Sequence, residues 1–426
     1  MKNIQTIKRI LTIALTIAAF LLNGCDQIQD IIDPEPEANV GDTLWVYELQ
    51  DLNFAESPLA IGPDGTIFAA AGGNGLNGDY RPYKILAFNK TDGTLKWQSE
   101  ELEWVQINSY IVVGDDGTVY VNSGHKLYSI NPSNGNFNWV WEVPQTLPGE
   151  NGNDVYTYGA LGQIALANDG DIITVNSFAG SHRRAVFKIR AGDGGLSWYR
   201  FTYMSTAASQ ITVGKNGTIF KFDNIDQKNV LTALNPENGS LIWSTDAYTP
   251  SYYNNISIAD NGDLITFVQT DTLARINYSN GQFIWKQNIS SWNVAKFIDN
   301  NGNVLTYNQW SGSSFYSVSN GSLVKGPFTT LPHNVCIDNK NQLYGVISDY
   351  DARLSITDEE GNLKWQSSMG IYGATTAVSD DKIIYFITVE NYVEKLFAVQ
   401  GDGSLAHSGW PRFSHDNRNT FNASKF

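Results

Sequence analysis

Residues 231–243 read LTALNPENGSLIW, and this stretch decides the fold because versions of it recur along the chain. An apolar segment ends in an Asn-Gly pair, and a second apolar segment follows that carries a tryptophan. Asparagine and glycine tolerate positive φ at little cost, so the pair suits a tight hairpin turn. The stretch therefore predicts two adjacent antiparallel strands.

Each repeat has two such turns, and apolar segments with strand-like alternation flank them. The first turns are Pro63-Asp64-Gly65, Asp115-Asp116-Gly117, Asn168-Asp169-Gly170, Lys215-Asn216-Gly217, Asp260-Asn261-Gly262, Asn300-Asn301-Gly302, and the degenerate Asn339-Lys340-Asn341 and Ser379-Asp380-Asp381. The second turns are Asp92-Gly93, Asn134-Gly135, Asp193-Gly194, Asn238-Gly239, Asn280-Gly281, Asn320-Gly321, Glu360-Gly361 and Asp402-Gly403. Eight repeats of four short strands, without a helical period, predict an all-β protein with an eight-bladed β-propeller of four-stranded antiparallel blades.

The strand expected at residues 43–47 precedes the first full repeat and has no partner of its own. We expect this strand to complete the last blade and close the ring, which removes the open sheet edges. Two alternatives stay open. One is a linear solenoid, which would need polar caps at both ends. The other is a seven-bladed ring in which the last repeat is partly linker.

A tryptophan follows most of the second turns at a fixed place. These residues are Trp97, Trp139, Trp198, Trp243, Trp285 and Trp365, and Trp45 lies in the strand before the first repeat. Repeats six and eight have Lys325 and His407 there instead. Burying one indole contributes roughly 4–6 kcal/mol, so we expect packing between neighbouring blades. A ring of stacking platforms for sugars or a cofactor is the alternative.

The N-terminus has the pattern of an export signal. Positive residues precede an apolar run over residues 10–22, and Leu22-Asn23-Gly24-Cys25 follows. These four residues resemble the lipobox of bacterial lipoproteins, in which the cysteine is acylated. The sequence thus predicts a signal peptide at 1–24, a lipidated Cys25 with an acidic tether at 25–40, and a single propeller domain at 41–426. An ordinary signal peptide with a chance cysteine is the alternative.

The net charge and the cysteine content restrict the kinds of partner and the disulfide bonds that we expect. The formal net charge is −15, so nucleic acid is not an expected partner. Cys25 and Cys336 are the two cysteines, and lipidation of Cys25 leaves Cys336 as a buried free thiol in an apolar run. We expect the lipid to hold the protein on a bacterial envelope membrane, the outer membrane in our interpretation.

The repeats at residues 85–97, 126–135 and 231–243 resemble PQQ-like β-propeller repeats, and the resemblance spans about residues 41–409. The resemblance implies two functional branches. Quinoprotein dehydrogenases hold pyrroloquinoline quinone and calcium under an adjacent cysteine pair, which this chain lacks. Non-enzymatic lipoproteins, including the propeller subunit of the outer-membrane barrel-assembly machinery, hold partner proteins with their loops. The final GWPRFSHDNRNT, residues 409–420, resembles a segment of extracellular members, and we interpret it as a packing or docking segment.

A search for reactive groups favours the second branch. The five histidines form no short metal-binding motif, no nucleophile elbow or phosphate loop is present, and the aspartates of the turns are explained by hairpin formation. We therefore predict no catalytic residue, no bound metal and no cofactor.

Binding is expected on the longer connections, residues 71–83, 142–160 and 246–254. Tyr156, Tyr158 and the basic cluster His182, Arg183 and Arg184 are the candidate contacts for a protein partner. The leading hypothesis is a membrane-anchored, non-catalytic protein-binding scaffold. A PQQ-dependent dehydrogenase and a glycan-binding surface protein are the alternatives.

Overall fold

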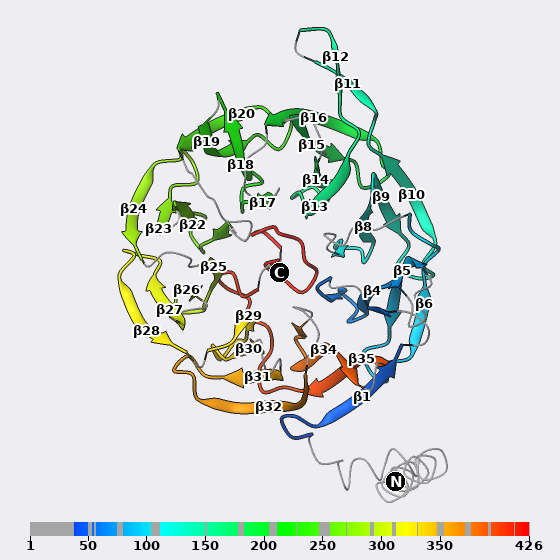
Figure 1. The fold of residues 1–426 in the computed structure, drawn as a ribbon, viewed down its shortest axis with the longest axis vertical. Helices are drawn as coiled ribbons and strands as arrows, with labels where there is room; N and C mark the ends of the chain where they lie inside the picture. Colours follow the sequence, from blue (N-terminus) through cyan, green and yellow to red (C-terminus); the bar gives the residue numbers. More distant parts are fainter. Residues whose placement is uncertain are drawn as a thin grey trace, which may run out of the picture. The chain divides into compact units, whose positions relative to one another are not determined.

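In the computed structural model the propeller forms one compact unit over Val40–Phe426. The structure describes residues 38–49, 53–54, 57–74, 80–103, 111–149, 151–177, 183–203, 211–226, 228–246, 256–269, 271–289, 294–308, 312–329, 331–346, 353–370, 376–390, 393–412 and 414–425. Strands and turns make up these ranges, and no helix in them is long and apolar enough to cross a membrane. Eight antiparallel sheets surround a common centre as the blades of a propeller (Figure 1).

The blades are numbered in chain order, and each runs from its innermost to its outermost strand. Blade 1 contains β3 (Ala60–Ile61), β4 (Ile67–Asn74), β5 (Tyr80–Phe88) and β6 (Leu95–Gln98), with β2 (Asn53–Phe54) also paired to β4; blade 2 contains β7 (Val112–Val113), β8 (Val119–Ser123), β9 (Lys126–Ile130) and β10 (Phe137–Glu142); blade 3 contains β13 (Ala160–Leu166), β14 (Ile172–Ser177), β15 (Arg183–Ile189) and β16 (Leu196–Tyr203); blade 4 contains β17 (Ile211–Val213), β18 (Ile219–Ile225), β19 (Lys228–Leu234) and β20 (Leu241–Asp246).

The second half of the chain repeats the same order. Blade 5 contains β21 (Ser257–Ile258), β22 (Leu264–Gln269), β23 (Thr272–Ile276) and β24 (Phe283–Asn288); blade 6 contains β25 (Val294–Ile298), β26 (Asn303–Asn308), β27 (Gly312–Ser317) and β28 (Leu323–Phe328); blade 7 contains β29 (His333–Ile337), β30 (Leu343–Val346), β31 (Arg353–Thr357) and β32 (Leu363–Gly370); blade 8 contains β33 (Ala377–Val378), β34 (Ile383–Glu390), β35 (Val393–Gln400) and β1 (Thr43–Glu48). A separate hairpin of β11 (Thr146–Pro148) and β12 (Asp154–Tyr156) joins blades 2 and 3.

The first strand closes the ring. β1 pairs antiparallel with β35, and Trp45 lies opposite Ala398. The N-terminal strand thus supplies the outermost strand of the last blade, so the prediction of closure is confirmed. The open solenoid and the seven-bladed ring are wrong, because the eighth sheet is complete once β1 is counted.

The eighth second turn is a correction. The sequence predicted a hairpin at Asp402-Gly403, but no strand after it returns to β35. The place of that strand is already occupied by β1, so the chain turns inwards instead. Leu405 forms an isolated bridge with Asp338 of blade 7. The two degenerate first turns do form, with Asn341 at φ 61° and Lys382 at φ 64° in the conformation that glycine takes elsewhere.

The antiparallel order gives the ring two distinct faces. Tight turns join the first strand to the second in every blade and the third to the fourth in blades 1 to 7, so they share one side, which we call the turn face. The connections between the second and third strands, and between successive blades, share the other side, which we call the loop face. The hairpin β11–β12 leaves from a blade-to-blade connection and projects beyond the rim (Figure 1).

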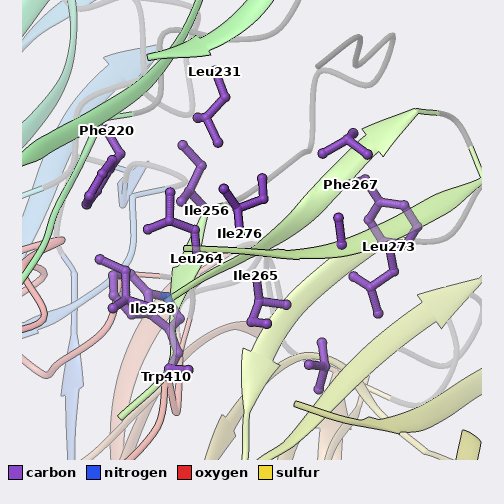
Figure 2. Packing of buried hydrophobic residues seen from close by; sticks show 14 of the residues in the cluster. Phe220, Leu231, Ile256, Ile258, Leu264, Ile265, Phe267, Leu273, Ile276 and Trp410 are labelled. Carbon is purple, nitrogen blue, oxygen red and sulfur yellow. The ribbon is translucent and has the colours of Figure 1, made fainter. Parts of the chain in front are cut away.

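Apolar side chains fill the spaces between blades. The largest cluster joins Phe220 and Leu231 of blade 4 to Ile258 and Leu264 of blade 5, and Trp410 from the C-terminal segment lies against it (Figure 2). Each of these side chains is almost wholly buried. Both faces of a blade are therefore covered, which explains strands with continuous rather than alternating burial, such as β8.

Candidate functional site: blade seams, centre and rim

The tryptophans of the repeat lie at the interfaces between neighbouring blades, which we call seams. In six of these tryptophans the indole N–H donates a hydrogen bond to a backbone carbonyl in the next blade's turn. The pairs are Trp45 to Lys90 (2.9 Å), Trp97 to Pro132 (2.7 Å), Trp139 to Ala191 (2.8 Å), Trp198 to Pro236 (3.0 Å), Trp243 to Tyr278 (3.0 Å) and Trp285 to Val318 (2.9 Å). A packed ring whose polar tip has a partner is a stabilising arrangement.

The turn glycine of the next blade makes room for each indole. A Cβ at Gly281 would lie 2.5 Å from Cε3 of Trp243, and one at Gly239 would lie 2.7 Å from Cε3 of Trp198. The seam between blades 7 and 8 has no such turn, because the outermost strand of blade 8 comes from the N-terminus. There Gly41, just before β1, lies against Trp365 instead. A glycine therefore packs against the indole at this seam too, but it comes from the N-terminal segment and not from a hairpin turn.

A β-bulge orients the tryptophan in the outermost strand. In blade 4, Leu241 pairs with Leu234 and Trp243 pairs with its neighbour Ala233, so Ile242 has no partner in the ladder. A bulge bends the strand and changes the direction of a side chain. Ile242 is 49% exposed on the outer edge, whereas the Trp243 indole turns toward blade 5.

Lys325 replaces the tryptophan at the seam between blades 6 and 7. Its Nζ forms ion pairs with Glu359 and, at 3.2 Å, with Glu360 in the turn of blade 7. Burial acts to lower the pKa of Lys325, but the two glutamates outweigh it and raise the pKa. Burial and the neighbouring Asp299 raise the pKa of Glu359. This seam is therefore ionic where the equivalent Trp seams are aromatic.

The C-terminal segment, residues 404–425, runs around the centre of the ring on the turn face (Figure 1). It bonds to the end of the innermost strand or the following turn in every blade. The partners in blades 1 to 8 are Ile61, Val113, Leu166, Val213, Asp260, Ile298, Ile337 and Val378. The expectation of a packing segment at 409–420 therefore corresponds to a belt that ties all eight blades together.

Buried polar groups hold the belt in shape. Arg412 is 3% exposed and donates to the Leu59 carbonyl of blade 1 at 3.3 Å. Asp416 accepts from the amides of Arg418 and Thr420 at 2.9 and 3.1 Å. Burial alone would raise the pKa of Asp416, but the nearby His415, the Thr420 hydroxyl and the charge of Arg418 hold it below its usual value.

A cavity of about 500 Å³ opens on the turn face where the belt meets blades 8, 1 and 2. Its charged side chains are paired with one another. Lys90 binds Asp381 at 2.6 Å, His407 lies 2.9 Å from Asp380, and Arg418 pairs with Asp115. No group of three or more metal-ligating side chains occurs among the described residues.

The rim hairpin carries one of the two predicted tyrosines. Tyr156 ends β12, opposite Thr146, and is 49% exposed. Leu147 of β11 is buried, and the Pro148 carbonyl accepts a hydrogen bond from Tyr199 of blade 3 at 2.9 Å. The hairpin is thus fixed to the outer strand of blade 3. Tyr158 lies apart from Tyr156, with its ring 4.0 Å from that of His125.

The structure describes only some of the other residues that the sequence singled out. Cys25 and His182 lie outside the described residues. Arg183 and Arg184 begin β15 and pair with Tyr203 and Thr202 of β16. Sequence reasoning missed Arg200 and Lys221, which the structure brings close to Arg184. Their only sequence signal is a charged residue inside an otherwise strand-like run.

The fold and the repeat define a PQQ-like β-propeller. The chain belongs to the family whose model is described as outer membrane protein assembly factor BamB, which matches residues 37–228, 83–266 and 227–405. No curated protein matches the chain.

Solved structures share the fold at low sequence identity. BamB from Moraxella catarrhalis is 15% identical with a TM-score of 0.58, covering 87% of this chain and 100% of that one. The quinohemoprotein alcohol dehydrogenase ADHIIG from Pseudomonas putida HK5 is 12% identical with a TM-score of 0.52, covering 87% and 79%. The C-terminal WD40 domain of Sif2 is 11% identical with a TM-score of 0.58, covering 85% and 100%. Because these proteins differ in kind, the likeness shows the fold alone.

The residues present do not fit the quinone and calcium of the dehydrogenase branch. The chain has no adjacent cysteines. On the turn face the belt bonds to all eight blades, and its Trp410 and Phe421 are wholly buried against the inner strands of the blades. We therefore derive no chemistry through that cofactor.

Proposed function

We propose that this protein is a lipid-anchored, non-catalytic scaffold of the bacterial cell envelope that binds protein partners. Membership of a family described as an outer membrane protein assembly factor supports an envelope location and a binding role. The lipobox-like sequence ending at Cys25 supports the lipid anchor and an outer-membrane location.

One observation carries the binding role. The C-terminal belt bonds to every blade on the turn face, while a hairpin with no part in any blade projects from the rim. The hairpin is fixed at its base by Leu147 and Tyr199 and presents Tyr156 half exposed. A rigid scaffold that holds out an aromatic side chain is typical of a protein interface.

Cross-linking in the native envelope tests this role. We expect Tyr156→Ser to reduce the yield of cross-linked partner, because an aromatic anchor contributes about 2 kcal/mol or more to an interface. Ile242→Ser is the matched control, since Ile242 is also 49% exposed but lies on the outer strand of blade 4. Equal yields from both variants would remove the hairpin from the proposed interface.

Two further assays test the anchor and the absence of catalysis. Labelling with an alkyne fatty acid should modify the wild-type chain and not a Cys25→Ser variant; labelling of both would contradict the anchor. The chain incubated with pyrroloquinoline quinone and calcium should not reduce a dye with alcohols. Alcohol-dependent reduction would show that the protein is an enzyme.

A further inference from the structure

The seam between blades 3 and 4 is apolar at one end and charged at the other. Toward the turn face it is apolar, with Val186 and Trp198 of blade 3 packed with Ile219 of blade 4. In the register of β15 and β16, Arg184 lies opposite Thr202 and Val186 opposite Arg200, so all four residues share the face that looks toward blade 4.

Blade 4 meets this face with its second strand. Ile219, Lys221 and Asp223 alternate along β18 and therefore point the same way. Lys221 and Asp223 are each 3% exposed in their side chains, and Nζ of Lys221 lies 3.4 Å from Oδ2 of Asp223. Toward the loop face the seam is thus made of charged side chains rather than apolar ones.

Three polar atoms of this group are buried and have no hydrogen-bond partner among the described residues. They are Nε of Arg184, Nε of Arg200 and the hydroxyl of Thr202. The Thr202 side chain is itself almost fully buried, with 2% of the residue exposed. Buried polar groups are normally satisfied, and an unsatisfied one costs about 1–3 kcal/mol.

The charges do not balance either. Arg184, Arg200 and Lys221 are three cations, and Asp223 is the carboxylate that acts on Lys221. Burial lowers the pKa of Lys221, Asp223 opposes the shift, and the charges of Arg184 and Arg200 add to it. In a chain of net charge −15, an excess of two positive charges in a buried seam is unusual.

Three of the connections that follow strands of these blades carry no carboxylate in their sequence. The sequence between β14 and β15 (178–182), between β16 and β17 (204–210) and between β20 and β21 (247–255) contains no aspartate or glutamate. These stretches are rich in serine, threonine, tyrosine and asparagine instead. Asp226, between β18 and β19, and Asp246, at the end of β20, are the other carboxylates at this end of blade 4, and both are exposed. Among the described residues, Asp223 is therefore the buried carboxylate beside the three cations.

We propose that the loop-face end of the seam between blades 3 and 4 is a binding site for a dianionic oxyanion group of the phosphate or sulfate type. Arg184 and Arg200 donate to its oxygens, since a guanidinium group matches oxyanions well. The Thr202 hydroxyl donates a further bond, and Lys221 behind them supplies positive charge. A dianion matches the two unbalanced charges. This site does not depend on the proposed scaffold role.

The test is a calorimetric titration of the purified full chain with inorganic phosphate and with sulfate, each compared with chloride at the same ionic strength. We expect binding of phosphate or sulfate that chloride does not reproduce. Arg184→Gln should weaken it by about tenfold or more, the loss of a charged hydrogen bond. The nearly isosteric Thr202→Val should weaken it about threefold, the loss of a neutral one.

Arg190→Gln is the matched control, because Arg190 lies in the same blade but is exposed and paired with Asp193 at 2.9 Å. It should bind as the wild type does. A second measurement separates a binding site from a structural role. Without added anion, Arg184→Gln should melt at a higher temperature than the wild type, because it removes an unneutralised buried charge.

Two results would overturn the proposal. One is a wild-type chain that does not distinguish phosphate and sulfate from chloride. The other is an Arg184→Gln chain that still binds the anion as the wild type does, whatever its melting temperature.

Discussion

Replacing Gly281 with alanine is expected to destabilise the protein much more than the same change at Gly302. Both glycines have φ 72°, so both replacements carry the same backbone strain. A Cβ at Gly302 meets nothing within 4 Å, whereas a Cβ at Gly281 lies 2.5 Å from Trp243. The pair of variants thus separates backbone conformation from contact with the indole.

The expected magnitudes follow from these two terms. An alanine in the left-handed region costs about 1–2 kcal/mol. Forcing an extra methyl group into a packed contact costs a further 1–3 kcal/mol or so. We therefore expect the free energy of unfolding to fall by about 1–2 kcal/mol for Gly302→Ala and by about 2–5 kcal/mol for Gly281→Ala.

Equilibrium unfolding in urea measures both losses, read from the midpoint at an unchanged slope. Adding Trp243→Phe should reduce the cost of Gly281→Ala, because the smaller ring leaves room for the methyl group. Equal losses for the two glycine variants, or a cost at Gly281 that does not depend on the ring at residue 243, would refute the view that the turn glycines serve the indoles.

Two further predictions concern the belt, one concerns the ionic seam and one concerns the free thiol. Removing residues 409–426 should lower the urea midpoint and speed proteolysis, because the belt bonds to all eight blades; unchanged resistance would contradict this. The pKa of Asp416 is depressed in the folded chain, so its ionised carboxylate stabilises the fold at pH values above the ordinary carboxyl pKa of 3.8. This stabilisation is lost as the pH falls through the lower pKa of the folded chain. The free energy of unfolding of Asp416→Asn should therefore fall less between pH 5 and pH 3 than that of the wild type. Lys325→Met should lower the free energy of unfolding by about 1–2 kcal/mol, between the values for exposed and buried ion pairs. In 1 M salt, where the screening length is roughly 3 Å, the urea midpoints of the variant and the wild type should lie closer together. Burial raises the pKa of Cys336, so a thiol reagent should label it only at the rate of unfolding, and fast labelling of the folded chain would contradict its buried placement.

The sequence predicted the architecture because its signals are local and repeated. Each Asx-Gly turn and its flanking apolar run specifies a hairpin without reference to the rest of the chain. The lone strand containing Trp45 also predicted closure, because it had no partner of its own and the eighth repeat lacked a tryptophan strand. The final hairpin at Asp402-Gly403 was wrong, since the turn signal is present but its strand position is taken by β1.

The candidate sites were predicted less well, because they depend on residues far apart in the chain. Tyr156 and Tyr158 are two positions apart in sequence, yet Tyr156 is exposed on the rim hairpin and Tyr158 packs against His125. The charged seam joins Arg184, Arg200 and Lys221 from three strands in two blades. No local pattern connects these residues, so the sequence could not group them.

By itself the sequence determined the eight repeats, nearly all of their hairpins and the tryptophan within most outer strands, since turn conformation and apolar alternation act over a few residues. The tertiary structure decided which glycine packs on which indole, what replaces tryptophan at Lys325, and that the C-terminal residues cross the centre to bond to every blade. The physical reason is that these contacts form only when the ring has closed and brought distant segments of the chain within hydrogen-bonding distance.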